Sequence, residues 1–519
     1  GEGALDIFTD GGAGSKMLRF DGDLRKVGFL ASEPGFLPYQ WGRHDKVLVI
    51  GPGGGKDVLT ALLGGARSVT AVELSPGVVD ADNRFERYNG HLFHRKEVNL
   101  VQGDGRAYLD RTADQYDMIY LPLVVTQTAD NSGSLSENYL FTKESVRGYL
   151  TRLGPGGKLV VQLHDEAEAL KFFLLATSVL QTQGEPLAEA VRHIVVVNGA
   201  SEHGMTGGVM LPVVVVQREP LTQDQIAVVR ESAARLRQQL LLVPGEPGRW
   251  LPKSLATGAF TIAWAERLVP ALRLAPPTDD QPFFWEFKAG LPNRILFLLI
   301  GVGLACVGVV LTVIRRTLAG GEGHAGRQWV GWYFAGLGVA YMLVEVGLIQ
   351  RGRLFLGDSG RAIAAVLFGL LVGGGLGSLL FEVTRRRIRV RWSWILPVIG
   401  VTAAGYGVGL MSVYSGLNVA GESVRLWIVI GSILPLGLLM GIPFPLGLAT
   451  LWGGADPTAE IPQMMAVNGV FSVLGSVLAL ATALTVGYTW TFVAGAAVYL
   501  LLGLGLLSGR LGEELRSLG

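Results

Sequence analysis

The chain has 519 residues, a formal net charge of +1 and a single cysteine, and 49% of its residues are hydrophobic against 17% charged. Soluble domains carry about 25% charged residues, so a large part of this chain is expected to lie outside water. The balanced charge gives no basic field, so we expect no nucleic-acid partner. The lone Cys306 excludes an intrachain disulfide and a cysteine-based zinc site. His91 and His94 have no evident acidic or cysteine partner, so we predict no metal site.

Residues 1–290 have the pattern of a soluble α/β region, in which short apolar strands alternate with more polar helices. Leu5–Thr9 and Met17–Phe20 predict a β-hairpin, so residues 1–45 are interpreted as an N-terminal β-hairpin region. Residues 46–290 predict a Rossmann-like domain, because alternating strands and helices form a parallel sheet with right-handed crossovers. Its strands are predicted at Lys46–Ile50, Val69–Leu74, Val98–Gln102, Tyr116–Leu121, Lys158–Leu163, Ile194–Val197 and Val213–Gln217. Its helices are predicted at Lys56–Leu63, Val78–Tyr88, Lys143–Leu153, Ala167–Gln181 and Leu221–Leu241.

Residues 291–519 consist of apolar runs long enough to cross a membrane. A helix of about 20 residues rises about 30 Å, which matches the hydrocarbon core of a bilayer. Because lipid cannot satisfy backbone hydrogen bonds, such runs are expected to be helical. The sequence therefore predicts an all-α transmembrane bundle of about seven helices, with the lipid bilayer as a partner. The predicted spans are Arg294–Ile314, Trp329–Ile349, Ala362–Phe381, Ser393–Val413, Leu426–Leu451, Met464–Val486 and Trp490–Leu507.

Polar and helix-breaking residues interrupt these spans. Glu345 and Asn468 are predicted to be embedded in the membrane, where a carboxylate is costly unless it faces a partner or a cavity. A hydrogen bond to a neighbouring helix is the alternative role for Glu345. The sequence Gly-Ile-Pro-Phe-Pro at 441–445 interrupts the fifth span. It indicates either a simple kink or a broken helix that lines a polar cavity.

A candidate nucleoside site follows the first strands of the α/β region. The glycine loop after Lys46–Ile50 contains Gly51, Gly53 and Gly55, and glycine lets a backbone turn tightly and approach a ligand closely. Glu73 ends the next strand, where a carboxylate can accept both ribose hydroxyls. Asp104 and Gly105 follow the third strand, where Asp104 could meet an adenine amino group. Each acid alone is also typical of a helix cap, but the three positions together predict an adenosyl cofactor in one crevice.

The glycine loop also limits which cofactor fits. It lacks the lysine–serine pair of a phosphate-binding loop, which argues against ATP. It also lacks the Gly-x-Gly-x-x-Gly spacing typical of NAD, because the glycines alternate and Asp57 stands where the helix begins. The loop therefore indicates a cofactor without a pyrophosphate.

At these residues the chain resembles the spermidine synthase family and, through it, class I S-adenosylmethionine-dependent transferases. The motifs in family order are Val47–Gly55, Val69–Pro76, Gln102–Arg106, Tyr116–Tyr120 and Leu153–Gly157. The chain looks most similar to a branch of multispanning membrane proteins with a spermidine synthase-like domain. That branch is indicated by Asp21–Asp23, Ser136–Thr142, Thr278–Phe284, Tyr341–Arg351 and Val467–Ser476. The resemblance implies S-adenosylmethionine or its decarboxylated form as cofactor, and it is compatible with further transmembrane segments or partner subunits.

The chain departs from the family where the acceptor amine would bind. Spermidine synthases place an acid where this chain has Gly54, and an Asp-rich signature where it has Leu121–Val125. An ammonium must lose a proton before it attacks, so the loss of both acids puts ordinary aminopropyl transfer in doubt. Tyr139, Asp130 and His164 are the candidate catalytic residues, with capping or packing as their alternative roles. Gln127 and Glu137 are further polar groups near the predicted crevice.

Three functions remain open from the sequence. The first is a membrane-anchored transferase that moves a methyl or aminopropyl group to a small-molecule amine or a membrane-associated acceptor. The second is a transporter or sensor with a regulatory nucleoside-binding domain. The third is a non-catalytic structural or assembly subunit with a degenerate spermidine synthase-like domain.

Two arguments place the α/β domain on opposite sides of the membrane. We expect an integral protein of a prokaryotic inner membrane, and S-adenosylmethionine is made in the cytoplasm, which favours a cytoplasmic domain. The positive-inside rule favours the other side, because loops on the face opposite the domain hold more arginines. Those arginines are Arg315, Arg316, Arg327, Arg385, Arg386, Arg387, Arg389 and Arg391, against Arg351, Arg353, Arg361 and Arg425 on the same face as the domain.

Overall fold

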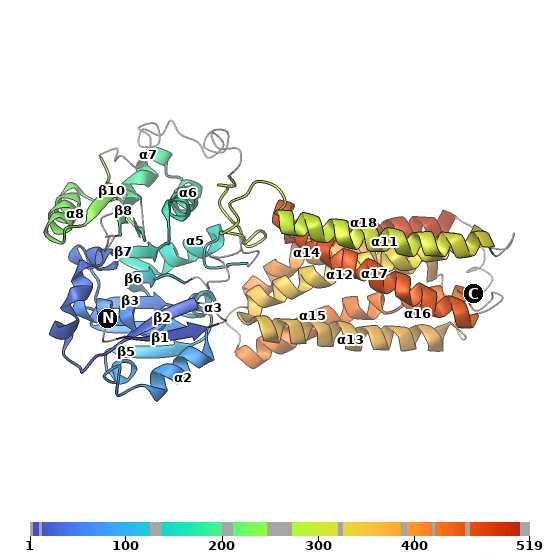
Figure 1. Ribbon diagram of the computed structural model, residues 1–519, viewed down its shortest axis with the longest axis horizontal. Helices are drawn as coiled ribbons and strands as arrows, with labels where there is room; N and C mark the ends of the chain where they lie inside the picture. Colours follow the sequence, from blue (N-terminus) through green and yellow to red (C-terminus); the bar gives the residue numbers. More distant parts are fainter. Residues whose placement is uncertain are drawn as a thin grey trace. The chain divides into compact units, whose positions relative to one another are not determined.

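The computed structural model describes residues 4–9, 13–124, 137–199, 211–245, 272–319, 325–385, 392–417, 421–451 and 457–508. The chain divides into two compact units, Gly1–Ala289 and Gly290–Gly519. The first unit is an α/β unit and the second is entirely helical among its described residues (Figure 1). The predicted fold class is confirmed, and each unit is described by itself below.

A mixed eight-stranded sheet forms the centre of the α/β unit, in the order β10-β8-β9-β7-β6-β3-β4-β5. The strands β5, β4, β3, β6 and β7 run parallel to one another. The strand order reverses between β3 and β6, and ligands of such sheets bind at the carboxyl ends beside this reversal. The strands are β3 (Lys46–Ile50), β4 (Ser68–Glu73), β5 (Val98–Gln102), β6 (Tyr116–Leu121), β7 (Leu153–Gln162), β8 (Ile194–Asn198), β9 (Val213–Gln217) and β10 (Gln239–Leu242).

The prediction of a wholly parallel sheet was wrong for the other half. Strand β9 is antiparallel to β7, and β8 pairs antiparallel with both β9 and β10. Consecutive strands that pair antiparallel need no crossover helix, so the alternation rule fails there. The helix predicted at Leu221–Leu241 was also too long, because α8 (Gln223–Arg235) is followed by β10. Arg237 has a positive φ of 56°, which ends the helical path before the apolar strand.

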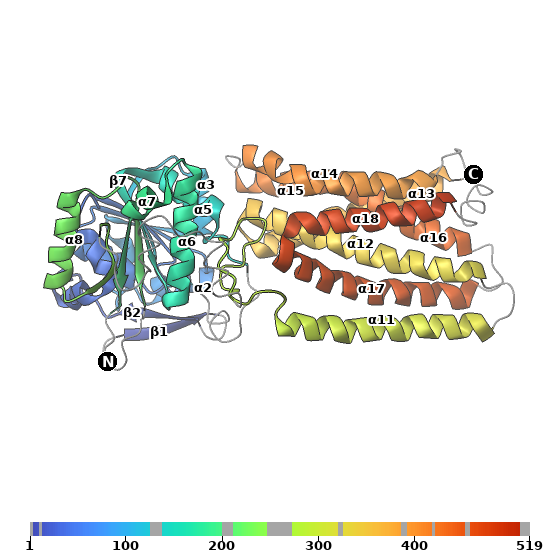
Figure 2. The ribbon, with the colours of Figure 1, turned by 90° about the horizontal axis from the view of Figure 1, so that it is seen from above.

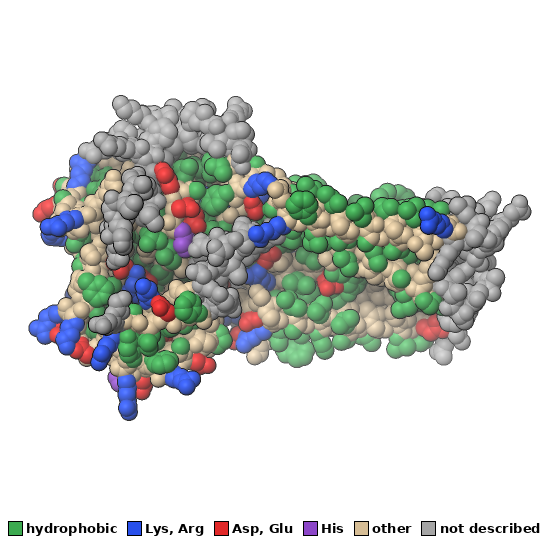
Figure 3. All heavy atoms as spheres, viewed as in Figure 1, with side chains coloured by type: hydrophobic (Ala, Val, Ile, Leu, Met, Phe, Trp, Pro, Cys, Tyr) green, Lys and Arg blue, Asp and Glu red, His purple; other side chains and the backbone are tan. Residues whose placement is uncertain are grey.

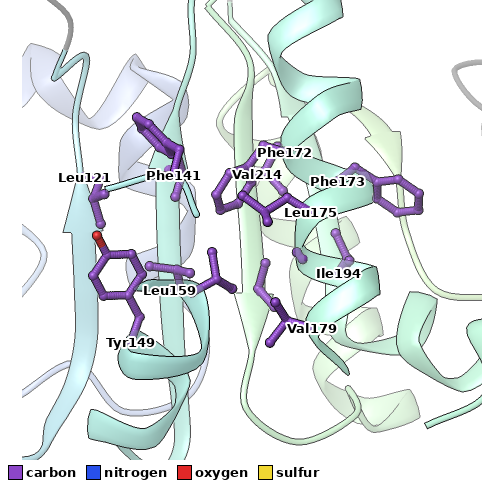
Figure 4. Packing of buried hydrophobic residues seen from close by; sticks show 14 of the residues in the cluster. Leu121, Phe141, Tyr149, Leu159, Phe172, Phe173, Leu175, Val179, Ile194 and Val214 are labelled. Carbon is purple, nitrogen blue, oxygen red and sulfur yellow. The ribbon is translucent and has the colours of Figure 1, made fainter. Parts of the chain in front are cut away.

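Helices cover both faces of this sheet. Alternate residues of β3 enter different cores: Leu48 and Ile50 pack with α5 and α6, whereas Val47 and Val49 pack with α1 and α8. Figure 4 shows the first core, in which α6 and α5 side chains pack against strand residues such as Leu159. The remaining helices are α1 (Lys56–Leu63), α2 (Pro76–Arg84), α3 (Gly105–Arg111), α5 (Lys143–Arg152), α6 (Glu166–Thr182) and α7 (Leu187–Ala190), with 3-10 turns η1 (Leu24–Ser32), η2 (Pro34–Gln40), η3 (Leu92–His94) and η4 (Val191–His193).

The N-terminal hairpin packs onto the glycine loop. Strands β1 (Ala4–Thr9) and β2 (Ala13–Leu18) pair antiparallel, so the second strand begins earlier than the predicted Met17. Met17 also forms a bridge with Gly55, and the Gly54 amide donates to the Ser15 hydroxyl at 2.9 Å. A Cβ on Gly54 would lie 2.6 Å from the Met17 nitrogen. Glycine is therefore required at this position by the hairpin backbone itself.

The second unit contains seven helical segments long and apolar enough to cross a membrane, among the residues that the structure describes. Figure 2 shows their long, side-by-side course, and Figure 3 shows hydrophobic side chains spread over the visible face. On the first helix Phe297 is 70% exposed and Leu304 is 67% exposed, which suits contact with lipid. The helices are α11 (Asn293–Ala319), α12 (Ala325–Leu356), α13 (Ser359–Thr384), α14 (Ile395–Gly416), α15 (Glu422–Met440), α16 (Pro443–Leu451), α17 (Pro457–Val486) and α18 (Tyr488–Ser508), with the short turn η6 (Trp392–Trp394) before α14.

Substitution of Gly54 tests the packing of the hairpin. We expect Gly54→Ala to cost about 1–3 kcal/mol, because its methyl group would overlap backbone atoms that cannot rotate away. Hydrogen exchange of the full chain in detergent should show faster exchange of the amides at 13–18. Gly28→Ala is the matched control, since a Cβ there meets no atom within 4 Å. Unchanged protection of residues 13–18 in Gly54→Ala would refute the packing argument.

Candidate functional site

The glycine loop after β3 is held by hydrogen bonds within the chain. Gly51, Gly53 and Gly55 have φ values of 75°, 50° and 88°, which L side chains rarely adopt. All four backbone amides of the loop donate hydrogen bonds within the chain. Two of them donate to backbone carbonyls, Gly51 to Val72 O (2.8 Å) and Gly55 to Pro52 O (3.0 Å). The other two donate to side chains, Gly53 to Glu73 Oε2 (3.2 Å) and Gly54 to Ser15 Oγ (2.9 Å). These amides do not form an open anion cradle, which agrees with a cofactor that lacks a pyrophosphate.

Glu73 joins the end of β4 to this loop. Its side chain is buried, its Oε2 accepts from Gly53 and its Oε1 accepts from the Ser75 amide at 2.9 Å. Burial raises the pKa of the Glu73 carboxyl. A carboxylate has about four acceptor positions, so the two oxygens can each accept one more hydrogen bond. The arrangement therefore fits the two hydroxyls of a ribose.

Asp104 and Gly105 form the next part of the same edge. The Gly103 amide donates to the Glu73 carbonyl at 2.8 Å, which ties the turn after β5 to the end of β4. Asp104 caps α3, because its Oδ1 accepts from the Ala107 amide at 2.8 Å. A Cβ on Gly105 would overlap the side chain of Ile50, so glycine is needed there for packing against β3. Contact of Asp104 with an adenine remains a prediction.

Sequence reasoning missed Asp82, a buried carboxyl on α2. Asp82 is 2% exposed, and neither carboxyl oxygen has a hydrogen-bond partner among the described residues. Burial and the negative charge of Glu73 raise the pKa of Asp82 to about 8. The carboxyl is therefore mainly protonated at neutral pH. One feature of the sequence indicates that Asp82 is buried: it lies four residues after the apolar Val78, and residues four apart share one face of a helix.

Arg106 was also missed, and it organises the segment that contains Tyr139. The Arg106 guanidinium makes a bidentate pair with Asp279 at 2.5 and 2.6 Å. It also donates to the Tyr139 carbonyl and to the Thr142 hydroxyl, both at 3.0 Å. Because Thr142 is the N-cap of α5, this cluster fixes the segment beside α3. Tyr139 is thus held through its backbone, and a catalytic role for its side chain remains a prediction.

His164 follows β7 at the same edge of the sheet, in a carboxylate pair. Its Nδ1 lies 3.2 Å from Glu168 Oε2, and its amide donates to the same oxygen at 2.9 Å. The other Glu168 oxygen accepts from the Trp285 indole at 2.8 Å. This arrangement orients the imidazole. In the sheet, β6 lies between β7 and β3, so the strand before His164 is about 10 Å from β3 at ordinary strand spacing. His164 is therefore close to the end of β6 and not beside Glu73, which ends β4.

Other predicted polar groups are not brought into this arrangement. Asp130 and Gln127 lie outside the described residues. Glu137 is described and precedes Asn138, whose amide donates to the Pro282 carbonyl at 2.7 Å.

The expectation that His91 and His94 lack an acidic neighbour was wrong. Glu86 Oε2 lies 3.6 Å from His91 Nδ1 and 3.8 Å from His94 Nδ1. The three potential ligand atoms fall within 4.8 Å of one another. Both imidazoles are exposed, and each is more than half accessible to solvent. Glu86 comes close to both imidazoles because the chain turns back between Glu86 and His91, where the His91 amide donates to the Glu86 carbonyl at 2.7 Å.

Comparison with known proteins identifies the α/β unit. A model of the spermine/spermidine synthase domain matches residues 34–197. The chain contains a spermidine synthase domain. It is 27% identical over 152 residues to a polyamine aminopropyltransferase of Sulfolobus acidocaldarius, a match that covers 29% of this chain and about half (49%) of that protein. It is 29% identical over 244 residues to polyamine aminopropyltransferase 2 of Hyperthermus butylicus, covering 46% of this chain and 72% of that protein.

Solved structures similar to the spermidine synthase domain include two spermidine synthases. One, in complex with the transition-state analogue AdoDATO, shares 14% identity over 52% of this chain and 87% of its own, with a TM-score of 0.31. The enzyme from Thermotoga maritima shares 13% identity with the same coverage and a TM-score of 0.30. Human methyltransferase-like protein 13 in complex with SAH shares 17% identity over 41% of this chain and 90% of its own, with a TM-score of 0.27.

Replacement of Asp82 tests its unusual ionisation. An aspartate has a pKa of about 3.9 in an unfolded chain, so between about pH 4 and pH 8 the folded state holds a proton that the unfolded state has lost. Stability should therefore fall as the pH rises through this range. We expect Asp82→Asn to remove that dependence and to raise the thermal midpoint at pH 8 by about 2–4 °C, but much less at pH 5.

The measurement is thermal unfolding of the full chain in detergent at both pH values. Asp80→Asn, an exposed neighbour on the same helix, is the control and should not change the pH dependence. A stabilisation by Asp82→Asn that is equal at pH 5 and pH 8 would contradict the assignment.

Proposed function

We propose that this protein is a membrane-anchored S-adenosylmethionine-dependent transferase that acts on a small amine or a membrane-associated acceptor. The observation that carries the proposal is Glu73, a buried carboxylate with one oxygen bonded to the glycine loop and the other to the turn after β4, so that each retains an acceptor position. The matched spermidine synthase domain supports the same class of cofactor. Because that cofactor is made in the cytoplasm, we place the domain on the cytoplasmic side of the membrane.

The residues of this edge suit an adenosyl sulfonium, either S-adenosylmethionine or its decarboxylated form. Glu73 would accept the ribose hydroxyls, and the turns at Gly51–Gly55 and Gly103–Gly105 would flank the nucleoside. The internally bonded loop amides leave no place for a pyrophosphate. Because Asp82 is mainly protonated at neutral pH, it adds no second negative charge to that of Glu73 at the proposed ribose site. When bound, such a cofactor supplies an electrophilic carbon as a methyl or an aminopropyl group.

The acceptor side of the domain lacks the acids typical of aminopropyl transfer. Gly54 is covered by the hairpin backbone, so a carboxylate cannot replace it without moving β2. The end of β6 continues into Leu123 and Val124, which give an apolar surface. We infer that His164 is the group that accepts the acceptor's proton, because Glu168 orients its ring at the carboxyl end of β7. Methyl transfer and aminopropyl transfer both fit these residues.

A non-catalytic role is the second candidate, and one contact favours it. A Cβ on Gly51 would lie 2.9 Å from the Val124 side chain, so part of the loop is approached by the chain's own residue. A domain that no longer binds a cofactor would keep this close approach of Val124 to Gly51. The two candidates differ in one measurable property, which is affinity for an adenosyl sulfonium.

Replacement of Glu73 tests the transferase. We expect Glu73→Gln to weaken the binding of S-adenosylmethionine about tenfold or more, because hydrogen bonds to a charged group contribute about 1.5–3 kcal/mol. Calorimetric titration of the full chain in detergent, with the natural and the decarboxylated cofactor, measures this change. Glu166→Gln, an exposed acid at the start of α6, is the control and should bind as the wild type does.

Two outcomes would contradict the proposal. If the wild type binds neither form of the cofactor, the non-catalytic role is favoured. If Glu73→Gln binds as tightly as the wild type, the cofactor site has been assigned to the wrong residues.

A further inference from the structure

A cavity of about 400 Å³ lies inside the helical unit, among α12, α13, α15, α16, α17 and α18. Small-molecule sites commonly have volumes of about 300–1,000 Å³. The cavity borders the point where α15 ends at Met440 and α16 begins at Pro443. The interruption predicted at 441–445 is therefore a break between two helices rather than a simple kink.

The backbone at this break is already satisfied by neighbouring side chains. Ser378 of α13 donates to the Gly441 carbonyl at 2.9 Å, and Tyr333 of α12 donates to the Pro443 carbonyl at 2.7 Å. Asn468 of α17 donates to the Phe334 carbonyl at 3.0 Å and also lines the cavity. Irregular backbone at membrane depth is tolerated when it is capped in this way or lines a cavity. The break therefore shapes a defined cavity, and its carbonyls do not need a ligand.

Glu345 is a buried acid beside the cavity wall. It is 9% exposed and is not itself a lining residue, but its side chain bonds to Tyr341, one helical turn earlier, and Tyr341 lines the cavity. Among the described residues no Lys, Arg or His forms an ion pair with it. A carboxyl at this depth is costly unless it is neutral or meets a cation. Glu345 with Tyr341 is therefore a place where a positively charged ligand would be stabilised.

The other lining residues agree with a cation that carries an apolar chain. Among the described residues that line the cavity there is neither a basic nor an acidic side chain, so the nearby Glu345 is the group that favours a cation over an anion. Tyr341, Phe444 and Tyr499 present aromatic rings, whose faces attract ammonium groups. Leu337, Leu370 and other aliphatic residues complete the wall, and the volume is far larger than a bare metal ion needs. We propose that this cavity binds an alkylamine, with its ammonium group at Tyr341, where the neighbouring Glu345 carboxyl supplies the counter-charge.

The test uses the full chain in nanodiscs at pH 7 and two probes with the same alkyl chain. Octylamine is protonated at this pH and octanol is neutral. Equilibrium dialysis with radiolabelled probes, corrected with empty nanodiscs, should show saturable binding of about one octylamine per chain. We expect Glu345→Gln to weaken octylamine binding at least tenfold and to leave octanol binding unchanged. Glu422→Gln, an exposed acid that pairs with Arg361 at the start of α15, is the control and should bind like the wild type.

A second variant keeps the test decisive if Glu345→Gln is unstable. A Cβ on Gly375 of α13 meets no atom within 4 Å, and Gly375 lines the cavity, so Gly375→Leu should narrow the cavity without a clash at its Cβ. We expect this variant to keep the thermal midpoint of the wild type and to lose octylamine binding. Equal binding of octylamine and octanol by the wild type would overturn the proposal. Full octylamine binding by a folded Gly375→Leu or Glu345→Gln variant would overturn it as well.

Discussion

The spermidine synthase domain depends on one carboxylate that joins two turns. Glu73 accepts from the Gly53 amide and from the Ser75 amide, and its carbonyl accepts from Gly103. The three turns that follow β3, β4 and β5 are therefore connected through a single residue at the carboxyl edge of the sheet. In the proposed transferase, this connection sets where the nucleoside binds. Burial, together with the nearby charge of Glu73, raises the pKa of Asp82 to about 8.

The parts of this site that follow chain-local rules could be predicted from sequence. A buried strand that ends just before Gly51 and a second that ends at Glu73 are expected to meet at one edge of a parallel sheet, and β3 and β4 do pair in parallel. Arg106 and Asp279 lie 173 residues apart, and no local pattern indicates that they pair. The strands β8 and β9 were predicted, but their antiparallel direction was not, because strand direction depends on the partner strands and not on the apolar pattern. The reason for glycine at 54 was likewise hidden, since the atoms it avoids belong to β2.

Each unit buries an ionisable side chain, and the surroundings of that side chain differ between the two units. In the α/β unit the buried cation Arg106 is matched by Asp279, so no ligand is needed to neutralise it. In the helical unit no cation among the described residues pairs with Glu345, and its side chain bonds to Tyr341, which lines a cavity. An amine acceptor for the domain and an ammonium ligand for the bundle belong to one chemical class. The two proposals rest on different residues and are tested with different variants.

The most direct test of the central claim is a cryo-EM structure of the full chain with S-adenosylhomocysteine. The account predicts density for the nucleoside at the ends of β3 and β4, with both ribose hydroxyls within about 3 Å of the Glu73 carboxylate. It also predicts that the glycine-loop amides keep their partners within the chain. Density at another place, or no density at a saturating concentration, would contradict the account.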